Sequence, residues 1–186
     1  MLDVDELIGD CRAALAETSP QGAVREVLAR AMATPEEAEA ALPPTRAELT
    51  PLYRSAELTI LKVVWAPAMM IPPHDHRMWA AIGIYGGGED NTFFRRDGGR
   101  VVTSGGRQLR VRDTVILGDD TIHSVTNPMR RAFTGSVHIY GGDYFGTPRS
   151  LWDPQTMEEG PADGPRLQQL FEEANARLDA DGRASG

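Results

Sequence analysis

The sequence has few of the side chains from which metal and redox sites are often built: one cysteine, Cys11, and four histidines among 186 residues. A single thiol excludes an intrachain disulfide and any metal cluster held by several cysteines. It also fits a reducing compartment. A metal site in this protein would therefore have to rest on other ligands.

Long apolar runs and an excess of basic residues are also absent. No apolar stretch approaches the length that spans a bilayer, and Asp3, Asp5 and Glu6 interrupt the N-terminus, where a signal peptide would be apolar. The formal net charge of -8 disfavours a general binder of phosphate backbones, which needs a basic face. We therefore expect a cytoplasmic protein without a membrane or nucleic-acid partner.

The chain changes character twice along its length. Residues 1–48 are rich in Ala, Leu, Glu and Arg at helical spacing and predict two or three short helices. Residues 49–150 contain short runs of Val, Ile, Thr and aromatic residues between turn residues, which is typical of a β-sandwich or barrel. Residues 151–186 again show helical spacing between Pro165 and Leu178. A chain of this length, 41% hydrophobic, is expected to form one domain overall: a β-sandwich or barrel with N-terminal helices packed on it and a C-terminal helix.

Local signals place several individual elements. Thr34-Pro35-Glu36-Glu37 predicts the start of a helix, with Thr34 as the cap and the two acids favoured by the helix dipole. Within the β-rich segment, six strands are predicted: Leu58–Trp65, Met78–Tyr85, Asn91–Arg96, Asp113–Leu117, His123–Thr126 and Phe133–Tyr140.

All four histidines fall in the β-rich segment, as His74-Asp75-His76, His123 and His138. Residues two apart on a strand point to the same face, so His74 and His76 can direct their imidazoles at one point, which His123 reaches from a later strand. A His-x-His pair alone is more often a polar strand face, but three neutral imidazoles suit a divalent transition metal and leave coordination positions open. The pattern predicts a metal site of His74, His76 and His123.

These residues resemble the cupin superfamily, whose first motif contains His-x-His and whose second contains a His followed four positions later by Asn. His123 and Asn127 fit the second motif. Cupins commonly carry a further Glu ligand four or five positions after the second His, where this sequence has Ala80 and Ala81, and Glu89 lies too far along the chain to match. The resemblance implies a mainly β, double-stranded β-helix (jelly-roll) barrel with a three-His metal site that lacks a carboxylate ligand.

A narrower resemblance is carried by Ser136, His138 and Tyr140, which alternate along one predicted strand. In the thiol dioxygenase group of cupins, which includes cysteine dioxygenases and 3-mercaptopropionate dioxygenases, a Ser-x-His-x-Tyr strand lies beside a three-His iron. The match implies a mononuclear non-haem Fe(II) enzyme that uses O2 to oxidise the thiol of a small acid to a sulfinate, with Tyr140 acting on the reactants and His138 and Ser136 orienting it. Animal cysteine dioxygenases cross-link this tyrosine to a cysteine, but the matching position here is Ala81, so Tyr140 should be unmodified.

Two arginines could bind the carboxylate of such a substrate, because a planar guanidinium forms paired hydrogen bonds with it. Arg54 resembles the carboxylate-binding arginine of the cysteine enzymes. Arg149, nine residues beyond Tyr140, resembles the arginine of the mercaptopropionate enzymes, and we favour it slightly. For any arginine, a surface position is the more common one.

Other kinds of function stay open at this point. A metal-dependent cupin enzyme could act on a substrate without a thiol, and a non-catalytic cupin could bind a small acid as a sensor or store. Three imidazoles also accept nickel, manganese or zinc in place of iron. The sequence leaves open which acid is bound, which metal is used and the oligomeric state.

Overall fold

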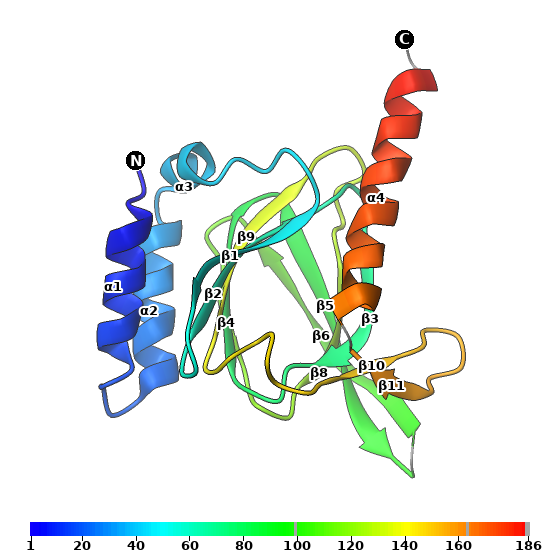
Figure 1. The fold of residues 1–186 in the computed structure, drawn as a ribbon, viewed down its shortest axis with the longest axis horizontal. Helices are drawn as coiled ribbons and strands as arrows, with labels where there is room; N and C mark the ends of the chain where they lie inside the picture. The colour runs from blue at the N-terminus through cyan, green and yellow to red at the C-terminus, as the bar shows by residue number, and fades with distance from the viewer. Residues whose placement is uncertain (99, 163, 185–186) are drawn as a thin grey trace.

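The computed structural model describes residues 1–98, 100–162 and 164–184, which form a β barrel flanked by helices (Figure 1). The helices are α1 (Val4–Ala14), α2 (Pro20–Met32), α3 (Pro35–Ala41) and α4 (Gly164–Ala184). The strands are β1 (Glu48–Arg54), β2 (Thr59–Trp65), β3 (Met70–Asp75), β4 (Ala80–Gly86), β5 (Gly88–Asp97), β6 (Arg100–Arg110), β7 (Thr114–Leu117), β8 (Ile122–Thr126), β9 (Thr134–Tyr140), β10 (Ser150–Trp152) and β11 (Glu159–Pro161). Two antiparallel sheets result, one in the order β1-β2-β9-β4-β7 and the other in the order β11-β10-β3-β8-β5-β6.

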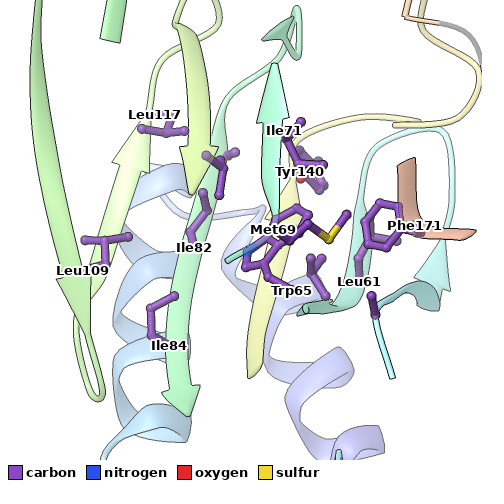
Figure 2. Packing of buried hydrophobic residues seen from close by; sticks show 14 of the residues in the cluster. Leu61, Trp65, Met69, Ile71, Ile82, Ile84, Leu109, Leu117, Tyr140 and Phe171 are labelled. Atoms are coloured by element: carbon purple, nitrogen blue, oxygen red, sulfur yellow. The ribbon is translucent and has the colours of Figure 1, made fainter. Parts of the chain in front are cut away.

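The five-stranded sheet is covered on both of its faces. Its central strand, β9, pairs with β2 and β4, and every residue of β9 is buried. Val137 and Ile139 face outward into a cluster with helix residues such as Leu28. Tyr140 belongs to the cluster inside the barrel, where Leu61 and Trp65 also lie (Figure 2). Alternate residues of one strand therefore serve two separate hydrophobic layers.

Helices α1 to α3 form the outer layer on this sheet, with α1 and α2 side by side (Figure 1). The start of α1 is capped by Asp3, whose Oδ1 accepts hydrogen bonds from the backbone N–H groups of Asp5 and Glu6. Helix α3 begins at Pro35 as predicted, but the side chain of Thr34 makes no capping hydrogen bond. Proline and acidic residues in the first turn mark this start instead.

Helix α4 packs against the barrel on a different side from α1 and α2 (Figure 1). Phe171 stacks on Trp65, with ring centroids 5.6 Å apart. The amide of Asn175 is buried and exchanges two hydrogen bonds with the backbone of Ala47, at 3.0 and 2.9 Å, just before β1. The C-terminal helix is thus held by both apolar and polar contacts and contributes to the barrel interior.

Asn127, the last position of the second cupin-like motif, connects the loop after β2 with the loop between β8 and β9. Its side-chain N–H2 donates to the carbonyl oxygens of Trp65, Ala66 and Ala132, and its Oδ1 accepts from Met129 N–H and the Thr134 hydroxyl. All donors and acceptors of this buried amide are used. Its role in this fold is to close the barrel beside β8.

The fold class expected from the sequence is confirmed: a mainly β barrel of two antiparallel sheets with three N-terminal helices and one C-terminal helix. All six predicted strands are present, with ends that differ by up to three residues. Five further strands, β1, β3, β6, β10 and β11, lie outside these six ranges, although the histidine pattern had already placed His74 on a strand, and β3 contains it. β6 in particular is mostly exposed and rich in Arg and Gly, so it lacks the apolar alternation on which strand prediction depends. None of the helices among the described residues is sufficiently long and apolar to cross a membrane.

Gly83 on β4 offers a test of the contact between sheet and helices. A Cβ at this position would lie 2.8 Å from the Cγ atoms of both Leu28 and Met32 on α2. We expect Gly83→Val to lower the free energy of unfolding by about 1–3 kcal/mol through overpacking, measured by urea denaturation. Gly9→Ala on α1 is the control, because a Cβ there meets nothing within 4 Å, and it should be neutral or stabilising. Equal stability of the two variants would contradict this packing.

Candidate metal centre

Three buried histidines converge inside the barrel. His74 lies near the end of β3, His76 follows directly after that strand, and His123 lies on β8. His74 and His123 are direct cross-strand partners, with ring centroids 4.5 Å apart. One ring nitrogen of each histidine lies within 4.8 Å of those of the other two. The structure therefore brings together the three histidines that the sequence pattern selected.

Hydrogen bonds fix the orientation of two of these imidazoles. Nδ1 of His74 lies 2.9 Å from the carbonyl oxygen of Pro72, and Nδ1 of His123 lies 2.6 Å from Oδ1 of Asn91. Because both partners are acceptors, Nδ1 is the donor in each bond, and Nε2 keeps its lone pair. Nε2 of His123 lies 3.4 Å from Nε2 of His76, so the two rings are directed toward a shared point.

Burial keeps the three imidazoles neutral. It lowers the pKa of His74 to about 4, against the effect of the hydrogen bond to Pro72, and the nearby charge of Arg149 lowers it further. Burial and the neighbouring histidines also hold the pKa of His76 and of His123 well below the usual value. Neutral imidazole is the form that binds a metal ion.

This donor set fits a divalent transition metal ion. Three neutral imidazoles in reach of one point are a common protein contribution to zinc, iron, copper and nickel sites, and they leave coordination positions open. Among the described residues, no carboxylate belongs to the set. The ligands would be His74, His76 and His123, and the choice between these metals is not encoded in the ligands alone.

A second group of polar residues faces the histidines from the opposite sheet. Ser136, His138 and Tyr140 alternate along β9 and point into the barrel, and the ring of Tyr140 lies 5.0 Å from that of His76. The Ser136 hydroxyl donates to the carbonyl oxygen of Val63, so its oxygen accepts from Nε2–H of His138 at 3.0 Å. Nδ1 of His138 lies 3.1 Å from the hydroxyl oxygen of Tyr140, within hydrogen-bonding distance. The three side chains form one hydrogen-bonded chain that ends beside the metal ligands.

Glu89 on β5 lies in the site, although the sequence analysis did not include it among the site residues. It is fully buried, its Oε2 accepts the indole N–H of Trp65 at 2.8 Å, and the same oxygen lies 3.4 Å from Nε2 of His138. Its Oε1 accepts the amide N–H of Asn91 at 3.0 Å, and Asn91 in turn accepts from His123. One carboxylate thereby connects the metal ligands with the Ser136-His138-Tyr140 chain.

The charge on Glu89 is stabilised despite its burial. Burial by itself raises the pKa of this carboxyl, but the hydrogen bonds from His138, Trp65 and Asn91 outweigh it and hold the pKa below its usual value. The sequence did contain a signal for this site. Glu89 and Asn91 are polar residues two apart, so on a strand they share a face, but nothing in the sequence marks that face as the inner one.

The two candidate arginines lie in different surroundings. Arg54 is about half exposed and forms a paired hydrogen bond with Asp143, at 2.7 and 2.8 Å. It lines neither of the two cavities near the histidines. Arg149, by contrast, has Nε and Nη1 buried without a hydrogen-bond partner, and its guanidinium lies 3.7 Å from the ring centroid of Tyr144. Of the two predicted substrate-binding arginines, the structure brings Arg149 to the site and leaves Arg54 at the surface.

Two adjoining cavities lead to the histidines. The inner one has a volume of about 20 Å³ and is lined by the three metal-site histidines together with His138 and Tyr140. The outer one has a volume of about 740 Å³ and lies between the 144–149 loop, the start of α4 and β1. Four residues line both cavities: Leu49, Tyr144, Leu167 and Phe171. The route from solvent to the histidines therefore passes the first turns of α4.

No protein-family model matches the chain. Similar solved structures include the Bacillus halodurans protein BH2720, which is 16% identical with a TM-score of 0.49 and covers 56% of this chain and 77% of its own. An rmlc-like cupin family protein from Methanocaldococcus jannaschii is 10% identical with a TM-score of 0.42, and the match covers 52% of this chain and 81% of that protein. The Schizosaccharomyces pombe Cnp3 cupin domain is 11% identical with a TM-score of 0.45, and the match covers 55% of this chain and 67% of that domain. The likeness concerns the fold alone.

The four histidines allow a direct test of the metal ligands. We expect His123→Ala to reduce bound metal from about one ion per chain to near zero, because two imidazoles are too few to hold it in this pocket. The measurement is elemental analysis after loading with Fe(II) or Zn(II) and gel filtration. His138→Ala is the matched control: it removes a buried histidine of the same barrel that is not a ligand, and it should retain the metal. Full occupancy in His123→Ala would refute the assignment.

The hydrogen bond between Asn91 and His123 generates a second prediction. Asn91→Leu keeps the volume of the side chain but removes the acceptor that orients His123, so the metal dissociation constant should rise about 10- to 100-fold. A competition titration with a chromogenic chelator measures this change. Asp90→Asn is the control, because Asp90 points the other way and pairs with Arg110 at the surface. Equal metal affinity in both variants would show that the bond has no role in binding.

Proposed function

We propose that this protein is a thiol dioxygenase, which uses a metal held by His74, His76 and His123 to oxidise the thiol of a small carboxylic acid to a sulfinate. The observation that carries the proposal is the position of Arg149, whose Nε and Nη1 are buried without a hydrogen-bond partner, in the wall of the cavity that adjoins the three histidines. An anionic group is the partner that such a guanidinium requires. The thiol is inferred from the resemblance of the Ser136-His138-Tyr140 strand to that group of cupins.

The reaction is balanced without a further reductant. In R–SH + O2 → R–SO2H, both oxygen atoms are transferred to sulfur, and the electrons that sulfur loses are those that dioxygen gains. Bound iron would supply the chemistry that joins a thiolate and dioxygen, since a coordinated thiol is deprotonated. The protein contributes orientation, charge and exclusion of water.

Each side chain of the site has a separate task in this proposal. Arg149 holds the carboxylate, and Tyr144 fixes the plane of the guanidinium by stacking on it. Tyr140 offers its hydroxyl to the reactants beside His76, and His138 holds that hydroxyl in place. Burial raises the pKa of Tyr140 well above its usual value, so it acts as a neutral hydrogen-bonding group. The cytoplasmic location of the enzyme stays a prediction of the sequence.

The oxygen electrode tests the reaction. Protein reconstituted anaerobically with Fe(II) should consume oxygen with 3-mercaptopropionate or cysteine and form the sulfinate in matching amount. Tyr140→Phe should keep its metal but lose turnover, because the hydrogen bond to the reactants is gone. Propionate, which has no thiol, is the negative control. Metal-loaded protein that consumes no oxygen with any thiol would favour a non-thiol substrate or a non-catalytic acid-binding cupin.

The two arginines provide the test of carboxylate binding. Arg149→Gln should lower kcat/KM about 10- to 100-fold, because it removes charged hydrogen bonds to the substrate. Arg54→Gln is the matched control, with the same change in charge at the surface, and kcat/KM should stay within about twofold. The reverse result would move the substrate carboxylate to Arg54.

A further inference from the structure

The two cavities beside the histidines differ sharply in size. About 10–15 Å³ of such volume accommodates one water molecule, so the inner cavity of about 20 Å³ has room for roughly one small group beside the histidines. The outer cavity of about 740 Å³ falls within the range of about 300–1,000 Å³ that is typical of small-molecule sites. A reacting sulfur fits the inner space, but the remainder of a substrate has to extend into the outer one.

The walls of the outer cavity are mainly apolar. The surfaces around it come from Leu49, Phe145, Pro148, Leu167 and Phe171, with Arg149 as the one charged side chain among the described lining residues. Leu167 and Phe171 lie on α4 and also line the inner cavity, so the apolar surface continues from one space to the other. Hydrophobic affinity grows with the apolar area that is removed from water. A substrate that consists of a thiol, a carboxylate and a short linker would cover little of this apolar surface and would gain little affinity from it.

We propose that the outer cavity is a subsite for an apolar substituent, so that the preferred substrates are thiol acids with an alkyl or aryl group rather than the smallest ones. This inference rests on the proposed function for the thiol. The sulfur lies at the histidines, the carboxylate lies on Arg149 in the wall of the outer cavity, and the substituent contacts Phe145, Pro148 and Leu167. The site thus selects a monoanion with an apolar body.

The binding test uses acids that cannot react. Isothermal titration of the full-length protein compares propionate with 3-phenylpropionate, which adds one phenyl ring. Burial of the ring should tighten binding about 10- to 100-fold. Arg149→Gln should weaken both acids, since each uses the same guanidinium. Equal affinity of wild-type protein for the two acids would overturn the subsite.

Substitutions that place a larger side chain in the outer cavity test the same inference. Ala162→Phe adds a ring to the wall of the outer cavity and should weaken 3-phenylpropionate at least about fivefold while leaving propionate within about twofold. Gly164→Leu is a second filling variant, because a Cβ at Gly164 meets nothing within 4 Å. Val111→Phe is the control, since Val111 is exposed and lines neither cavity. Unchanged binding of 3-phenylpropionate in both filling variants would contradict the inference.

Oxygen uptake separates this inference from the proposed function. With 3-mercaptopropionate and its 2-benzyl derivative, kcat/KM should be about tenfold or more higher for the benzyl compound. Uptake with 3-mercaptopropionate but no preference for the benzyl compound would overturn the subsite and keep the thiol dioxygenase. A binding preference for 3-phenylpropionate without uptake from either thiol would keep the subsite for an apolar acid and overturn the dioxygenase.

Discussion

The alternation of side chains along β9 is the constraint on which the rest of this structure depends. Its residues point in turn to the helical layer and to the barrel interior, and both sides are fully buried. Apolar Val137 and Ile139 face α1 and α2, whereas Ser136, His138 and Tyr140 face the opposite sheet. A shift by one residue would bury the polar set against the helices and remove it from the metal ligands. The same pairing thus fixes the fold and the site.

Burial of so many polar groups requires that they satisfy one another. The carboxylate of Glu89 is the point where these requirements meet, because it accepts from Trp65 and Asn91 and lies beside His138. Through Asn91 it also influences the orientation of His123. A buried charge of this kind is costly unless it is fully hydrogen-bonded, and here its partners come from both sheets. The metal ligands and the hydrogen-bonded chain of Tyr140 are therefore parts of one network.

Helix α4 decides what can reach this network. It stacks Phe171 on Trp65, is tied to Ala47 through Asn175, and contributes Leu167 to both cavities. The barrel carries the three histidines, and the helix together with the 144–149 loop supplies the apolar surroundings of Arg149. In the proposed function, the reaction and the choice of substrate therefore depend on different segments of the chain.

Local patterns in the sequence predicted the six strands, the helices in the N-terminal and C-terminal segments, and the histidines of the metal site. Strand alternation and the His-x-His spacing act over a few residues, so they can be recognised in the sequence. They were insufficient for β6, whose exposed residues carry no such pattern, and for Glu89, which is remote from His138 in sequence. Nor could they separate Arg54 from Arg149, since each looks like a surface arginine until its neighbours are known. The sequence by itself determined the strand period, the donor types and the motif that selects His74, His76 and His123. Only the tertiary structure decided which charges are buried together and which cavity opens on them, because those depend on contacts between residues far apart in the chain.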